Sequence, residues 1–237
     1  MNHGSYALDH LTWSEAGRIL ARDSRLLFPV GALEQHGPHL PLGTNTFIAE
    51  SLARNVSEEL GILVAPAFPY GVAAPAAGPY AGRTSLRRKT LHRAVNEILA
   101  GWEDHGVSET VIVTAHRYEP HLDALLMALT ATSVTTVIDL YRIDVSDLLS
   151  GPAEAEHGGE LETSLMLHLA PTRVRTERIE DALHTGSAIR RYMRGGMPTP
   201  PKGSSGSVGR ATAATAEKGQ LLYQRFLAAM LVALEHD

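Results

Sequence analysis

The sequence lacks three features, and each absence excludes a class of protein or site. It has no cysteine, so disulfides and thiolate metal sites are excluded, and any metal must be held by His, Asp, Glu or neutral oxygen donors. It has no apolar run near the ~20 residues that span a bilayer, and its N-terminus lacks a signal-peptide pattern, which makes a cytoplasmic location the default expectation. It has no basic stripe, and its net charge of −5 argues against a nucleic-acid partner.

The 237 residues show no break in composition and no linker, which predicts a single domain over residues 1–237. Short apolar runs predict strands at residues 26–31, 62–65, 110–114 and 134–140. Apolar residues at helical spacing predict helices at residues 45–60, 91–105, 121–132, 160–169 and 213–235. Residues 66–85 and 191–209 are rich in small residues and proline and are predicted to be loops. Strands that alternate with helices indicate an α/β domain with a mainly parallel sheet.

Polar residues that could carry chemistry gather after two of these strands. Glu34 and His36 are two residues apart, so in an extended segment they share one face and could clip a metal ion. An equally good interpretation is a polar connector rich in proline and glycine. After the third strand, His116 is followed by Glu119 and His121, a pattern that by itself favours a solvated helix start.

Glu162 interrupts an apolar helical face that it shares with Leu165, Met166 and Leu169. A carboxylate that points into a core needs a cation or hydrogen bonds. Glu162 therefore either binds a metal or a partner, or it only accepts hydrogen bonds from the backbone amides at the start of the helix.

Four segments together resemble one family. PVGALEQHGPHLPLGTNT, which starts at Pro29, looks like the signature PVGSxEQHGPHLPLGTD of the creatininase (creatinine amidohydrolase) family. EHGGELETSLMLHLAP, which starts at Glu156, looks like that family's HAGxxETSxML segment. AGRTSL from Ala81 and ATAATAEKG from Ala211 are similar to its FPGTxSL loop and to the start of its last helix. The chain is thus identified as a divergent member from about Leu26 onward.

The resemblance implies a three-layer α/β fold, hydrolysis of C–N bonds in cyclic amides or formamides, divalent metals and a hexamer built from dimers. It implies metal-binding roles for five residues, namely Glu34, His36, Asn45, His116 and Glu162. It implies proton transfer by His157, with Glu156 assisting and Glu119 as a further catalytic candidate. Arg83, Arg117 and Tyr118 are the candidates for substrate binding. Gly158 and Gly159 are expected to leave room for a substrate beside His157.

Several positions depart from the family pattern. Asn45 stands where the family has an Asp that bridges two metals, and the family's NGHGGN or GHYEN segment has become TAHRYEP, so that Glu119 is three residues after His116 rather than two. Two dications need anionic ligands, so one ion, zinc, manganese or iron, is expected rather than two. The leading hypothesis is a metal-dependent amidohydrolase of specialised metabolism, with hydrolysis and the reverse, condensing or cyclising, direction both left open. The alternatives are a degenerate relative that binds a ligand without hydrolysis, and acid–base catalysis without metal.

Overall fold

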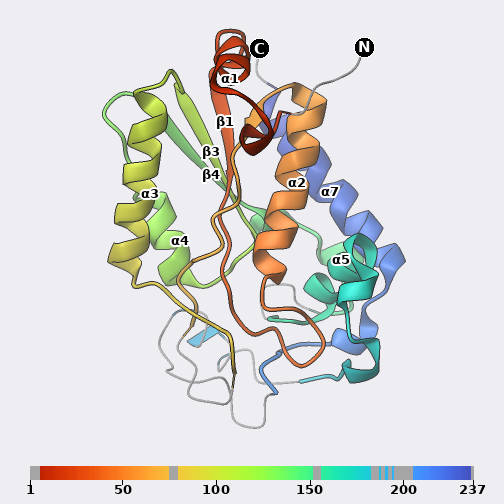
Figure 1. Ribbon diagram of the computed structural model, residues 1–237. Coiled ribbons are helices and arrows are strands. Elements are labelled where there is room, and N and C mark those ends of the chain that lie inside the picture. Colours follow the sequence, from red (N-terminus) through yellow and green to blue (C-terminus); the bar gives the residue numbers. More distant parts are fainter. Residues whose placement is uncertain are drawn as a thin grey trace.

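The structure is a computed structural model that describes residues 6–74, 80–151, 156–182 and 205–235, with Ser187, Arg190, Arg191 and Arg194 between the last two ranges. A parallel sheet lies between two layers of helices (Figure 1). The predicted three-layer α/β fold is confirmed. Among the described residues, no helix combines the length and the apolar character that a membrane crossing requires.

The sheet has four strands in the order β2-β1-β3-β4, all parallel. They are β1 (Arg25–Pro29), β2 (Leu63–Val64), β3 (Glu109–Thr114) and β4 (Val134–Asp139). Alternate residues of β1 face opposite layers, because Leu27 joins one hydrophobic cluster while Leu26 and Phe28 join the other. Pro29 is tolerated in this central strand because it is the last residue of β1.

One face of the sheet is covered by α2 (Thr44–Leu60), α5 (Glu160–Leu169) and α7 (Ala216–Leu234), and the other by α3 (Arg88–Glu103) and α4 (Glu119–Leu126) (Figure 1). α2 ends at Gly61, whose φ of 72° is the left-handed geometry that closes many helices. Short 3-10 helices complete the described elements: η1 (Leu8–His10), η2 (Leu140–Arg142), η3 (Ser146–Leu148), η5 (Pro171–Arg173), η6 (Thr176–Arg178) and η7 (Ala211–Ala213).

Two helices differ from the prediction. α4 ends at Leu126 rather than at residue 132, because the chain must turn there to enter β4 at Val134. Leu126 and Leu129, which lie within the predicted helix, are exposed. A further helix, α1 (Trp13–Leu20), was not predicted, although the Thr12 and Glu15 capping box at its start is a recognisable signal. The predicted loop at residues 191–209 lies largely outside the described residues.

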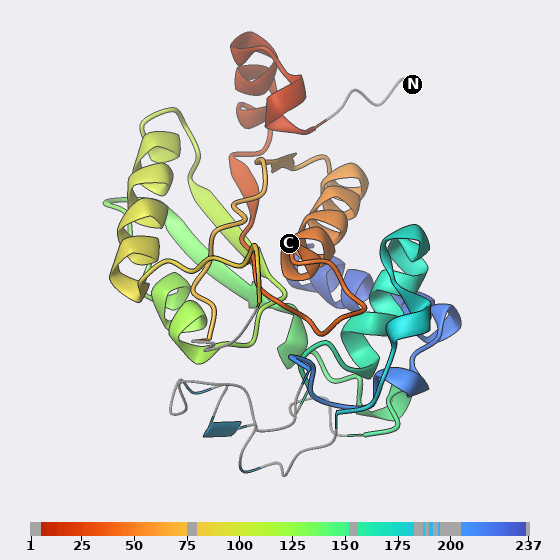
Figure 2. The ribbon, with the colours of Figure 1, turned by 60° about the horizontal axis from the view of Figure 1, so that its bottom comes forward.

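The chain leaves β1 toward one edge of the sheet and, after β2, crosses to the other side of β1 to enter β3. The connections that follow β1 and β3 therefore diverge at the carboxyl ends of these two strands. In open α/β sheets, ligands bind at such a switch point. Figure 2 brings this end forward and shows the segment between β1 and α2 lying between the α3–α4 side and α5.

Candidate active site

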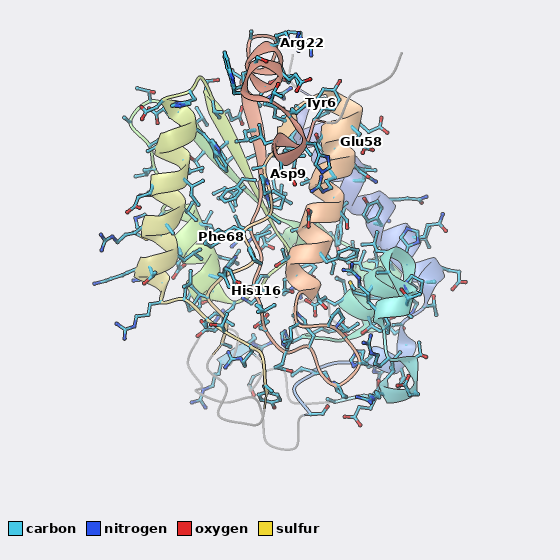
Figure 3. The ribbon with its side chains drawn as sticks, in the orientation of Figure 1. Tyr6, Asp9, Arg22, Glu58, Phe68 and His116 are labelled. Atoms are coloured by element: carbon cyan, nitrogen blue, oxygen red, sulfur yellow. The ribbon has the colours of Figure 1, made fainter. Side chains whose placement is uncertain are left out.

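Buried polar side chains converge at this switch point. The β1–α2 segment contributes Glu34 and His36, the first turn of α2 contributes Asn45, and the loop after β3 contributes His116. His157 arrives from the segment before α5, where it pairs with Val208 in an isolated bridge, and Glu162 comes from the first turn of α5. All six side chains are buried. Figure 3 places His116 in the lower half of the molecule, far from α1.

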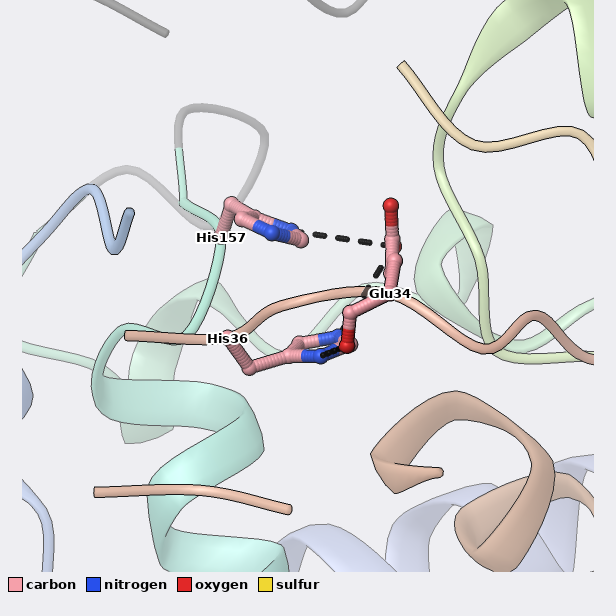
Figure 4. A group of neighbouring side chains, drawn as sticks. All are labelled: Glu34, His36 and His157. Atoms are coloured by element: carbon pink, nitrogen blue, oxygen red, sulfur yellow. Dashed lines mark hydrogen bonds and ion pairs between the residues drawn. The ribbon is translucent and has the colours of Figure 1, made fainter. Parts of the chain in front are cut away.

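Each of the three histidines uses one ring nitrogen to donate to a backbone carbonyl. His36 Nδ1 lies 3.2 Å from the oxygen of Glu34, His116 Nε2 lies 2.8 Å from that of Val72, and His157 Nε2 lies 2.6 Å from that of Gln35. The other nitrogen of each ring faces the Glu34 carboxylate: the distances to Oε1 are 3.8 Å from His36, 3.0 Å from His116 and 4.0 Å from His157. Figure 4 shows Glu34 beside His36 and His157. Metal-binding histidines are commonly oriented by such a carbonyl acceptor.

The amide of Asn45 links Glu34 to His36. With Nδ1 of His36 donating, Nε2 of the neutral ring is an acceptor, and it lies 2.9 Å from Asn45 Oδ1, another acceptor. Turning the amide over would instead set its oxygen against Glu34, to which Nδ2 now donates at 2.8 Å. A proton or a metal ion between His36 and Asn45 resolves the conflict.

The pKa shifts of the cluster also indicate that it accommodates a positive charge beside its carboxylates. Burial works against ionisation of Glu34, but His116 and His157 hold the pKa of that carboxyl well below its usual range. Burial also opposes ionisation of Glu162, yet His36 and His157 lower its pKa. Burial disfavours charge on His116, but the Glu34 carboxylate outweighs it and raises the pKa of the imidazole. A metal ion would take the place of that proton, as is usual when histidine binds a metal.

The donor set fits a divalent ion. Ligand atoms of Glu34, His36 and His157 lie within 4.8 Å of one another. His157, predicted to transfer protons, is therefore also placed to bind metal. Glu34 and Glu162 carry two negative charges, which balance one dication, whereas two dications would leave a buried positive excess.

A tyrosine that the sequence did not single out lies beside the cluster, next to the predicted Arg117. Tyr141, in η2, donates its hydroxyl to Glu162 Oε1 at 3.0 Å. Burial holds the pKa of this phenol well above its ordinary value, so it remains a donor. The Arg117 guanidinium lies 4.6 Å from the centre of the Tyr141 ring. Tyr141 is one of seven tyrosines in the chain, and no motif marks it.

His121 positions His116 through the backbone. Its Nδ1 accepts from the amide of Val72 at 3.2 Å, while the carbonyl of the same residue receives His116. Burial lowers the pKa of His121 well below its usual value, which keeps Nδ1 available as an acceptor. Gly71 must lack a side chain, because a Cβ there would lie 2.5 Å from His121 Nδ1.

Two other predicted residues, Tyr118 and Glu156, are buried. Tyr118 is buried beside His116, with ring centroids 6.3 Å apart. Glu156 is buried, and its carboxylate accepts from the amides of Leu161 and Arg210, so it caps α5.

Glu119 is exposed and pairs with Arg194 at 3.2 Å, which leaves it apart from the buried cluster. Arg83 donates to the carbonyl of Ala74 and is half-buried. Catalytic or binding roles for these residues stay predictions.

The two glycines after His157 allow close packing. A Cβ on Gly158, whose φ is +61°, would lie 2.7 Å from the backbone oxygen of His36. A Cβ on Gly159 would lie 2.7 Å from the carboxyl carbon of Glu156. Gly158 therefore lets the α5 segment approach the β1–α2 segment, and Gly159 leaves space for the Glu156 side chain. The expectation that they also leave room for a substrate stays a prediction.

Comparison with known proteins decides the family. The model of the family "Creatininase: Creatinine amidohydrolase" matches residues 9–234. The chain belongs to the creatininase family. A creatininase-family creatinine amidohydrolase of Pseudomonas putida is 30% identical over 243 residues, covering 93% of this chain and 92% of the relative. A mycofactocin precursor peptide peptidase of Mycobacterium tuberculosis (strain CDC 1551 / Oshkosh) is 32% identical over 217 residues, covering 84% and 79%.

Solved creatininase structures agree. A crystal structure of creatinine amidohydrolase superposes with a TM-score of 0.79 at 26% identity, covering 98% of this chain and 97% of that one. Two further creatininases, with TM-scores of 0.78 and 0.77, each 26% identical and matched over 97% of both chains, are described as a manganese form and as a Zn–Zn type. Family membership makes the chain a hydrolase of the metal-dependent amidohydrolase class.

Proposed function

We propose that this protein hydrolyses a C–N bond of a small cyclic amide, formamide or related substrate, with one divalent ion, zinc, manganese or iron, in the buried cluster. The carrying observation is that three histidines each donate one N–H to a backbone carbonyl and aim the other nitrogen at Glu34. A degenerate site has no physical reason to keep this arrangement. The residues that would hold the ion are Glu34, His36, Asn45, His116 and Glu162.

A bound divalent ion would supply a Lewis acid that acidifies a water and polarises the substrate carbonyl. The protein supplies the proton transfer. With Nε2 of His157 tied to the carbonyl of Gln35, Nδ1 is free to take a proton and deliver it to the leaving nitrogen. The same groups can serve the reverse, condensing reaction, since each step is reversible.

Metal content and turnover, measured together on matched variants, test this proposal. Elemental analysis of protein purified without added metal is combined with a screen of lactams, hydantoins, formamides and short peptides. Wild type and His105→Ala, which changes an exposed histidine at the end of α3, should hold about one ion per chain and turn over a substrate. His36→Ala should lose both.

The other outcomes separate the alternatives. A metal-free protein with no turnover would support a degenerate binding protein. Turnover that survives chelation would support acid–base catalysis by the histidines and carboxylates alone. Cleavage of peptides and of no other amide would move the substrate class toward that of the peptidase relative.

A further inference from the structure

A pocket of about 280 Å³ opens at the carboxyl end of β4. Its charged lining consists of four arginines and two carboxylates, namely Arg117, Arg142, Arg190, Arg194, Glu119 and Asp139. In a chain whose net charge is −5, this local positive excess stands out. Clefts lined by charge of one sign attract ions of the other.

The carboxylates of the pocket already have partners. Asp139 accepts from the amide of Tyr141 at 3.1 Å and lies 3.5 Å from Nε of Arg142. Glu119 pairs with Arg194. Neither carboxylate forms an ion pair or hydrogen bond with Arg117 among the described residues.

Among the arginines of the pocket, Arg117 has an N–H group without a hydrogen-bond partner in the described part of the chain. Its Nη1 is buried and has no hydrogen-bond partner among the described residues. The guanidinium is held in place by the Tyr141 ring, 4.6 Å away. A buried donor without a partner costs free energy, and a fixed guanidinium fork matches the two oxygens of a carboxylate or phosphate.

The pocket and the cluster share a wall. Tyr141 lines the pocket with its ring and donates its hydroxyl to Glu162. Arg117 directly follows His116 in the chain. A group bound to Arg117 would therefore lie across the Tyr141 side chain from the candidate metal ligand Glu162.

We infer that Arg117 and the arginines around it bind an oxyanion, a carboxylate or a phosphate, carried by the substrate. The part of this inference that assigns the oxyanion to a substrate rests on the proposed function. It narrows the substrate class to amides that bear a negative charge near the C–N bond. Arg117 thereby sets specificity.

Titration calorimetry at low ionic strength tests the inference without any turnover, using inorganic phosphate and succinate as probes. Wild type should bind at least one of them saturably. Arg117→Gln should weaken binding about tenfold or more, the loss expected for a hydrogen bond between charged groups. Arg117→Lys should fall between, because it keeps the charge and loses the fork. The matched control is Arg18→Gln, which removes the same charge from exposed α1 and should bind as wild type does.

The two probes separate the possible sources of the oxyanion, since a preference for succinate indicates a carboxylate and a preference for phosphate a phosphoryl group. No saturable binding to wild type would overturn the inference. So would equal affinities of Arg117→Gln and Arg18→Gln, or binding that His36→Ala abolishes and Arg117→Gln keeps, since the anion would then sit on the metal cluster. If Arg117→Gln fails to fold, Arg117→Lys and Arg142→Gln give the same comparison. Failure of amide hydrolysis leaves these titrations unaffected, so the two proposals can fail separately.

Discussion

We expect Asn45 to limit how much positive charge the cluster can hold. Its Nδ2 donates to Glu34 and its Oδ1 faces His36, so it lies between the two parts of the donor set. An Asp at this position would add a third negative charge where a second dication needs one. The side chain is otherwise of the same size, so the exchange changes charge with little change in packing.

We expect Asn45→Asp to raise the occupancy of a second divalent ion. Elemental analysis after dialysis should give about one ion per wild-type chain and more in the variant. Asn96→Asp, which makes the same change on α3 away from the cluster, should give the wild-type value. Two stoichiometric ions in wild type would contradict the expectation of one.

His157 has two roles open to it, and one variant separates them. If it moves protons, His157→Ala should lower the rate by roughly 10²–10⁴ while metal content and fold stay as in wild type. If its Nδ1, which lies with Glu34 and His36, binds the ion, metal and rate should fall together. Elemental analysis, circular dichroism and turnover of the identified substrate make the distinction. A near-normal rate would remove His157 from the chemistry.

Most members of the cluster could be predicted from the sequence, because they sit in two motifs with fixed spacing, around Glu34 and Glu162. Tyr141 shows what could not, and neither could its contact with Arg117, a residue that the sequence did single out. This contact depends on how η2 packs against the loop after β3, and it joins segments that no local pattern connects. Glu119 shows that closeness in sequence does not fix closeness in space, since the start of α4 turns it to solvent, where it pairs with Arg194. Its catalytic role stays a prediction.

At the scale of elements, α5 is held by its contact with α7. A Cβ on Gly219 of α7 would lie 1.9 Å from the backbone oxygen of Ser164 in α5. Helix α5 carries Glu162, so the close approach of these two helices also fixes a candidate metal ligand. The helices were predictable from apolar spacing, but this contact between backbones was not.

Gly219→Ala should therefore destabilise the protein, although Ala is the better helix former. The gain in helix propensity is about 0.5–1 kcal/mol, whereas forcing two backbones apart typically costs about 1–3 kcal/mol. Gly101→Ala is the matched control, because a Cβ at this helical glycine of α3 meets nothing within 4 Å. Urea unfolding should show a lower midpoint for Gly219→Ala and an equal or higher one for Gly101→Ala. A higher midpoint for both would mean that α5 and α7 are not in close contact.

At the scale of the whole molecule, the order of the strands and helices from β1 onward could be read from the sequence, because short apolar runs mark the strands and apolar residues at helical spacing mark the helices. The order of the strands within the sheet could not be read from the sequence, because an apolar run such as residues 110–114 carries no signal for which strand it pairs with. In the structure β3 pairs with both β1 and β4, and this places His116 opposite Glu34. The cluster is therefore a property of the sheet topology as much as of the motifs.

The last prediction concerns assembly, and Trp13 on α1 is the residue that tests it. Family resemblance implies a hexamer built from dimers, and Trp13 is 89% exposed in the single chain. Burying a large aromatic side chain is worth about 1.5–3 kcal/mol, so an interface is a physical reason for its place on the surface.

Light scattering at micromolar concentration should give a mass well above that of one chain. Trp13→Ser should raise the dissociation constant about tenfold or more, while Trp13→Phe, which keeps an apolar ring, should change it less. A stable wild-type monomer at that concentration would contradict the assembly, and equal behaviour of the two variants would place the interface elsewhere.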